Sequence, residues 1–165
     1  MSTCRVAAHC GADMPEPVTG ATIRAKFSTR LLSTCNRQEA HDYIAQLEAA
    51  VAASLMGLSP GRSWYGPHID TLLVFLDGAL VAGLAVRTVG LLDPLVVTGD
   101  LGAFPARLLD HVRLRAEGVL VAQAHEEYLF HVGPQAPAGW VELILKMGGT
   151  EDLGAEGIQT FRRKL

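Results

Sequence analysis

The sequence has few cysteines and no long apolar run, and both shortages restrict what the protein can be. Its three cysteines, Cys4, Cys10 and Cys35, form no C-x-x-C pair and leave one unmatched. This pattern favours free thiols over a disulfide framework or a zinc site. The apolar stretches 44–58 and 71–86 are interrupted by polar residues and glycine, and fall short of the roughly 20 uninterrupted apolar residues of a membrane span. We therefore expect no span and no metal site.

Charge excess and signature motifs are also missing. The chain has 14 basic and 17 acidic residues, and a net charge of −3 provides no general attraction for nucleic acid. Residues 1–20 lack the apolar core of a secretory signal, so synthesis in a cytoplasm is expected. The sequence contains no serine-hydrolase elbow, no phosphate-binding P-loop and no zinc-protease motif. These absences exclude several common enzyme classes.

The chain is long enough to form one domain with its own core. It has 165 residues, of which 49% are hydrophobic. Residues 1–20 mix small, polar and proline residues without apolar periodicity, and we interpret them as an extended N-terminal arm that would order only against a partner. A metal site formed by Cys4, His9 and Cys10 is the alternative for this segment. Residues 21–165 are expected to form the domain.

Local patterns predict an alternation of strands and helices. Asn36 and Glu39 have the spacing of a capping box, and Asp77-Gly78 is typical of a tight hairpin turn. The stretch that begins at residue 104 is predicted to be one long helix, with a shorter helix and a strand over 119–123 as the alternative. The predicted strands are 22–27, 71–76, 79–87, 95–98, 128–132 and 157–162, and the predicted helices are 37–56, 104–126 and 138–147.

This element order resembles the fold of the GCN5-related N-acetyltransferases (GNAT) over residues 21–165. The last part of the chain carries the resemblance best, because strand 128–132 is followed by an amphipathic helix, Gly148-Gly149 and a final strand. The resemblance implies an α/β (α+β) fold. Its central sheet would be mixed but mostly antiparallel, with helices on both faces.

A second resemblance is to a phage protein family. Segments 22–24, 97–100 and 132–133 are similar to landmarks of internal virion protein A of T7-like short-tailed phages, itself a GNAT-like family. This resemblance implies a virion component. Its partners would be other virion proteins or copies of itself.

The GNAT resemblance implies a loop that holds the pyrophosphate of acetyl-CoA on backbone N–H groups at a helix start. The segment in that place, 98–105, has no Arg or Gln ahead of its glycines, and Asp100 brings a like charge while Pro105 removes a donor. A role at the helix start explains these residues better. If acetyl-CoA were bound, the binding residues would be Thr98, Gly99, Leu101, Gly102 and Ala103.

The resemblance also implies a proton donor four residues before the glycine of a closing Gly-Phe motif. If Gly148 is that glycine, the donor position is Ile144, which cannot transfer a proton, and Gly149 replaces the aromatic residue. Tyr128 and His131 are the nearest substitutes, although core or sheet-surface roles explain them more simply.

A general base would have to lie near the central strands. Asp93 and Asp100 flank strand 95–98, but each is explained equally well as a turn former or a helix cap. We therefore assign no catalytic residue and no cofactor.

Two functions compete on this evidence. We prefer a structural or interaction protein without acetyltransferase activity, placed in the internal core or head–tail region of a phage virion after synthesis in the host cytoplasm. Trp64 and Tyr65 are candidates for its contact surface, or else they pack beneath their loop. The alternative is a divergent acetyl-CoA-dependent N-acetyltransferase, which a bulge in strand 95–98 and a divergence of strand 128–132 would support.

Overall fold

The computed structural model describes residues 26–53, 63–98, 106–133, 136, 139–152 and 159–165. The arm expected over 1–20 lies outside these residues. The helices are α1 (Arg37–Ala53), α2 (Ala106–Ala122) and α3 (Trp140–Lys146), with a short 3-10 turn η1 (Leu32–Thr34). The strands are β1 (Phe27–Leu31), β2 (Ile69–Leu76), β3 (Ala79–Arg87), β4 (Leu91–Leu92), β5 (Val96–Val97), β6 (Glu127–Val132), β7 (Thr150–Asp152) and β8 (Gln159–Lys164).

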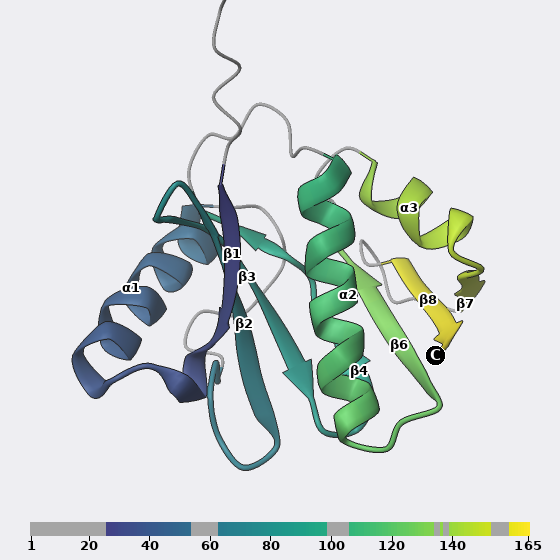
Figure 1. Ribbon diagram of the computed structural model, residues 1–165, viewed down its shortest axis with the longest axis horizontal. Helices are drawn as coiled ribbons and strands as arrows, with labels where there is room; N and C mark the ends of the chain where they lie inside the picture. The colour runs from purple at the N-terminus through teal and green to yellow at the C-terminus, as the bar shows by residue number, and fades with distance from the viewer. Residues whose placement is uncertain (1–25, 54–62, 99–105, 134–135, 137–138, 153–158) are drawn as a thin grey trace, which may run out of the picture.

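The strands form one mixed sheet between two helical layers (Figure 1). The strand order is β1-β2-β3-β4-β6-β8-β7, with β5 also paired to β3, and only the β4–β6 pair is parallel. Helix α1 covers one face of the sheet, while α2 and α3 cover the other. The predicted fold class is confirmed.

The core consists of two apolar clusters, one on each face of the sheet. Along β2, Leu72 and Val74 pack on the α2 side, whereas Leu73 and Phe75 pack on the α1 side. A strand buried on both faces explains why its sequence is apolar without alternation. None of the helices in the described ranges combines the length and apolarity needed to cross a bilayer.

Two local predictions are confirmed in atomic detail. The Asn36 side chain accepts the backbone N–H of Glu39 at 2.9 Å, and the Glu39 carboxylate accepts that of Asn36 at 3.1 Å, which closes the capping box of α1. At the hairpin turn, Asp77 and Gly78 have φ values of 49° and 85°, as a two-residue turn between antiparallel strands requires.

The end of α2 differs from the prediction. The long helix is confirmed and the alternative strand over 119–123 is wrong, but α2 ends at Ala122 rather than at residue 126. It ends because Ala124 turns into the left-handed region, with φ at 61°, and the N–H of His125 bonds to the Leu120 carbonyl at 3.1 Å. A left-handed residue at this point is usually glycine, so the helix end could not be predicted from the alanine at this position.

Several strand predictions need correction. The last strand, predicted over 157–162, continues to Lys164, and residues 157–158 lie outside the described ranges. The first strand was expected over 22–27 but runs over Phe27–Leu31, and Lys26 lies before it; residues 22–25 are outside the described ranges. The short strands β4 and β7 were not predicted. Strands of two and three residues carry no readable periodicity, because their partners define them.

Candidate functional site at the divergence of the central strands

One extra residue interrupts the strand that follows β3. Leu92 pairs with Val86, and Val96 pairs with Gly83, so three steps along β3 oppose four steps along the β4–β5 strand. This is a β-bulge. Pro94 lies inside it and has no N–H to give to the ladder. A bulge in strand 95–98 was expected to support the acetyltransferase alternative, and the bulge observed lies between Leu92 and Val96, where that predicted strand begins.

Strands β5 and β6 diverge directly after the bulge. The parallel ladder of β4 and β6 contains only Leu91↔Leu129 and Leu92↔Phe130. Beyond this point β5 pairs with β3, while β6 continues to pair with β8 as far as Val132. We call the space between β5 and β6 beyond the Leu92↔Phe130 pair the wedge. A divergence of strand 128–132, the second feature expected to support the alternative, is therefore also present.

A polar cluster lies where the wedge opens. Asp93 and His131 directly follow the last pair, and because Leu92 and Phe130 belong to the core under α2, their successors point to the opposite face. Arg87 Nε donates to both carboxylate oxygens of Asp93, at 3.0 and 3.1 Å. Asp93 is 6% exposed. The structure thus brings Asp93 and His131 together, two residues that the sequence analysis considered separately.

The charge state of His131 depends on this cluster. Burial lowers the pKa of the imidazole, while the negative charge of Asp93 raises it and the positive charge of Arg87 lowers it. His131 is thereby favoured as a neutral base near pH 7. Such a group can accept a proton if an amine reaches it.

On the α2 side, buried apolar side chains from the bulge, β6 and α3 belong to the core beside the wedge. Each of these side chains is no more than 3% exposed, and the rings of Phe130 and Trp140 meet edge to face with centroids 5.1 Å apart. The indole N–H of Trp140 is buried and finds no hydrogen-bond acceptor among the described residues. The core residues concerned are Leu95, Phe130, Val132, Trp140 and Ile144.

The position expected to donate a proton is closed as well as apolar. Ile144 is buried, and the N–H of Gly149 bonds to its carbonyl at 2.9 Å. Gly148 has φ of 83° and its N–H bonds to the carbonyl of Leu145, so α3 ends in a Schellman motif. A Cβ atom on Gly149 would lie 2.5 Å from Cγ2 of Ile144. The aromatic residue of the family motif therefore has no room here.

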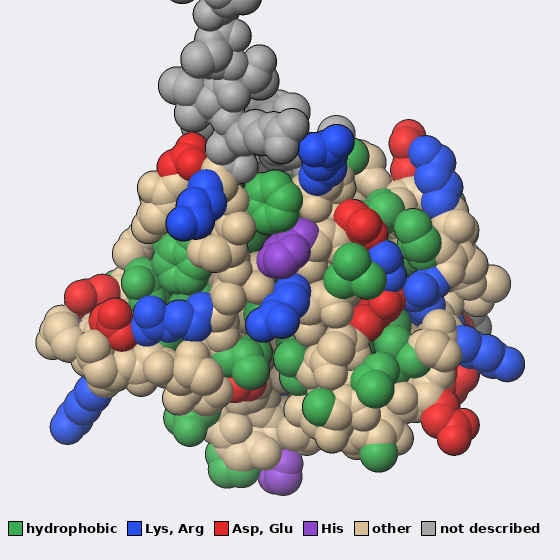
Figure 2. Space-filling model, viewed as in Figure 1, with side chains coloured by type: hydrophobic (Ala, Val, Ile, Leu, Met, Phe, Trp, Pro, Cys, Tyr) green, Lys and Arg blue, Asp and Glu red, His purple; other side chains and the backbone are tan. Residues whose placement is uncertain are grey.

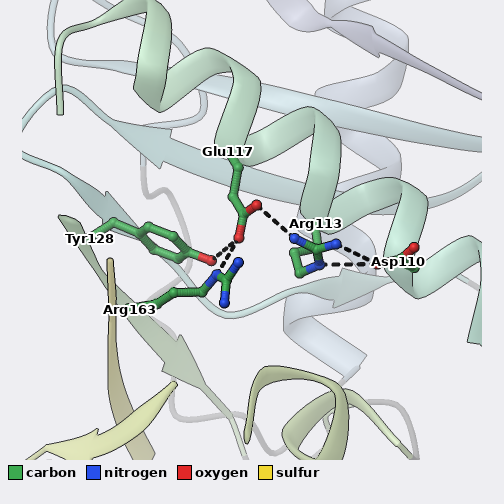
Figure 3. Close-up of polar contacts among 5 residues, drawn as sticks. All are labelled: Asp110, Arg113, Glu117, Tyr128 and Arg163. Carbon is green, nitrogen blue, oxygen red and sulfur yellow. Dashed lines mark hydrogen bonds and ion pairs between the residues drawn. The ribbon is translucent and has the colours of Figure 1, made fainter. Parts of the chain in front are cut away.

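Tyr128 lies on the other face of β6 from His131, and its hydroxyl is occupied (Figure 3). It donates to Oε1 of Glu117 at 2.8 Å, and the Nε of Arg163 donates to the same oxygen at 2.6 Å. Burial first, and then the hydrogen bond to Glu117, raise the pKa of Tyr128 well above its ordinary value. Tyr128 is therefore poorly suited to act as a proton donor at the wedge.

The sequence analysis did not identify the ion-pair network to which Tyr128 belongs. Arg113 extends it by donating to Glu117 at 2.7 Å and to Asp110 at 2.7 Å (Figure 3). The four-residue spacing of Arg113 and Glu117 on one helix was a readable signal. The contact with Arg163, 46 residues away from Glu117, was not.

The remaining predicted residues lie apart from the wedge cluster or outside the described ranges. Trp64 is buried and its indole N–H donates to Glu48, whereas Tyr65 is 59% exposed. Thr98 is half-buried, and its hydroxyl donates to the Leu80 carbonyl at 2.7 Å. The other proposed acetyl-CoA residues, Gly99, Leu101, Gly102 and Ala103, and the candidate base Asp100 fall outside the described residues.

Similarity to known proteins is found in the fold and not in the sequence. No family model and no curated protein matches the chain. The structure superposes on FeeM, an N-acyl amino acid synthase from uncultured soil microbes, with a TM-score of 0.61, 10% identity and coverage of 87% of this chain and 92% of FeeM. It also superposes on YncA, a putative acetyltransferase from Salmonella typhimurium solved with acetyl-CoA (0.58, 11% identity, 84% and 94% covered).

A third match is the GNAT domain of PAT from S. lividans, with a TM-score of 0.57, 9% identity and coverage of 86% of this chain and 90% of that domain. This chain has the GNAT fold. At these identities the similarity establishes the fold alone. The sheet of this chain has a bulge and a divergence, and Ile144, which the sequence resemblance places at the position of a proton donor, is buried. The resemblance to internal virion protein A stays a prediction from the sequence.

Proposed function

We propose that this GNAT-fold protein acts by binding other proteins, as a structural or interaction component, and not by transferring acetyl groups. The buried apolar core beside the wedge carries the proposal. Fully burying a large apolar side chain contributes about 1.5–3 kcal/mol to the stability of the fold. Opening the wedge to admit a ligand would expose several such side chains, among them Trp140 and Ile144. The lack of room for a side chain at Gly149 also favours a protein that does not transfer acetyl groups.

The sequence resemblance supplies the setting of this proposal. It indicates a phage virion, with other virion proteins or copies of the same chain as partners. The outer face of α2 offers a contact surface, since Leu114 and Val121 are 53% and 58% exposed with the bare backbone of Gly118 between them. Apolar side chains are visible over this part of the molecule in Figure 2. Adjacent exposed apolar residues of this kind favour contact with a partner.

The second candidate is a divergent acyl-CoA-dependent N-acyltransferase, favoured by the bulge, the divergence and the electrostatic influence of Asp93 on His131. In this case Arg87 would orient Asp93, and His131 would take a proton from the acceptor amine. The unpartnered indole N–H of Trp140 would donate to a carbonyl oxygen. Acetyl-CoA would bind at Thr98, Gly99, Leu101, Gly102 and Ala103 and supply the acyl group.

Calorimetric titration of the full chain with acetyl-CoA tests the two candidates against each other. We expect no heat of binding from protein that circular dichroism shows to be folded. Micromolar binding that is lost in the double variant Gly99→Ala, Gly102→Ala would overturn the proposal. The His131→Asn variant would then be assayed for acyl transfer. Binding that the double variant leaves unchanged would place the ligand away from this loop and leave the proposal standing.

A further inference from the structure

A surface groove of about 790 Å³ lies where η1, the first turns of α1 and the loop before β2 meet. Its apolar lining comes from Leu32, Ala40 and Ile44, and Tyr65 adds an exposed aromatic ring at its border. Tyr65 was predicted as part of a contact surface, but neither candidate function assigns a ligand to the groove itself. Its size is within the range of sites that bind small molecules or short peptide segments.

The polar border of the groove includes the cation Arg37. Arg37 and the imidazole of His41 are exposed and lie one turn apart on α1, and none of the described residues that line the groove is acidic. Of the acids nearby on α1, Glu39 forms an ion pair with Arg30 at 2.5 Å, and Asp42 accepts a hydrogen bond from Gln38 at 2.9 Å. The groove therefore suits an acidic ligand with apolar side chains.

We propose that residues 13–18 of the same chain, Asp-Met-Pro-Glu-Pro-Val, occupy this groove. The segment has two acids and no base, which complements the charge of Arg37. Pro15 and Pro17 fix their own φ and favour extended conformations in the residues before them, so the segment loses little entropy on binding. Grooves with aromatic borders are a common binding site for extended proline-containing segments, and Tyr65 provides such a border.

The chain length permits this contact within one molecule. Eight residues, 19–26, separate the segment from β1 and can span about 26 Å when extended. Strand β1 covers about 17 Å from Phe27 to Leu31, and Leu32, the next residue, already lines the groove. The segment can therefore reach the groove by running back along β1.

This inference goes beyond the proposed function and does not depend on acetyl-CoA binding. The natural cysteines provide the first test. Cys35 lines the groove, and Cys10 precedes the segment by three residues, whereas Cys4 is further away along the chain. In the full-length protein, a short bismaleimide should join Cys10 to Cys35 within one chain and join Cys4 to Cys35 much less. Mass spectrometry of the digested monomer band gives both yields.

Charge reversal makes the test specific. Arg37→Glu should lower the Cys10–Cys35 yield about fivefold, as expected for losing roughly 1 kcal/mol of charge contact. The triple variant Asp13→Lys, Glu16→Lys, Arg37→Glu should recover part of that yield. Lys164→Glu, which alters a cation on the distant strand β8, is the matched control and should change nothing.

Hydrogen exchange is a second readout that does not require Cys35 to react. We expect the amides of residues 13–18 to exchange more slowly in the wild-type chain than in Arg37→Glu. Exchange at the unprotected rate in the wild-type protein would overturn the proposal, as would equal cross-linking of Cys4 and Cys10. Cross-links found only between chains would overturn the intramolecular contact and assign the segment to a second copy.

Discussion

The two faces of β6 carry polar clusters of opposite character. On the α2 face, Tyr128 and Arg163 meet Glu117 in a network whose charges are paired and largely buried. On the other face, His131 is half-buried and lies beside the Arg87–Asp93 pair, where it can still change its protonation state. The difference separates two uses of charge in one fold. The first cluster holds α2 to the sheet, and the second is the only one of the two suited to proton transfer.

The largest loss of stability should come from removing Glu117, the central residue of the network on the α2 face of β6. Glu117→Ala leaves Arg163 without its acceptor and Arg113 with Asp110 alone. Removing one partner from a buried pair costs about 3–5 kcal/mol, and the slight exposure of Glu117 places the expected loss near the lower limit. Urea denaturation measures it, with Glu142→Ala on the exposed side of α3 as the control. A loss equal to the control would show that the network is not needed for stability.

The next largest change in stability should come from adding a side chain at Gly149, where there is no room for one. Gly149→Ala should lower the free energy of unfolding by about 1–3 kcal/mol, because its Cβ would lie 2.5 Å from Cγ2 of Ile144. Gly118→Ala is the matched substitution on α2, where a Cβ meets nothing within 4 Å. It should stabilise the protein by about 0.5–1 kcal/mol through helix propensity. Thermal denaturation of the two variants should therefore shift in opposite directions, and a shift in the same direction would contradict this account of Gly149.

Alkaline pH should remove the stability that Tyr128 contributes through its hydrogen bond to Glu117. Because the pKa of Tyr128 is raised in the folded state, the unfolded chain loses this proton first, near its ordinary value of about pH 10. The contribution of Tyr128 is thus fully present below that pH and falls as the pH rises above it. The Tyr128→Phe variant should lose about 1 kcal/mol at neutral pH and show a flatter decline in alkali. Parallel alkaline curves for the two proteins would rule out this role.

Features whose partners are close in the sequence could be predicted, whereas contacts between distant segments could not. The capping box at Asn36 and the turn at Asp77 were predicted because their partners lie within a few residues. The left-handed Ala124 was not, since alanine rarely adopts that conformation. The contact of Glu117 with Arg163 depends on the pairing of β6 with β8, which only the assembled sheet provides.

The residues around the wedge show the same distinction between local features, which were predicted, and long-range contacts, which were not. The sequence resemblance identified Ile144 at the donor position, and it named the bulge and the divergence as features to look for. It did not indicate that Asp93 and His131 would meet, because they are brought together by a parallel ladder of only two residue pairs. Short pairings between distant strands leave almost no trace in composition or periodicity.

The smallest expected effect is a change in the pKa of His131, and it is the most informative about the cluster of Arg87, Asp93 and His131. Asp93→Asn should lower the pKa of His131, because it removes the negative charge that raises it, and Arg87→Gln should raise that pKa by removing a positive charge. NMR titration of the imidazole protons measures both shifts without any assumption about activity. If neither variant moves the pKa, His131 is set by burial alone and the cluster loses its candidacy as an acid–base pair. Opposite shifts would establish an electrostatically coupled group at the mouth of the wedge, which is the minimum that the acyltransferase candidate requires and which the interaction protein has no need to keep.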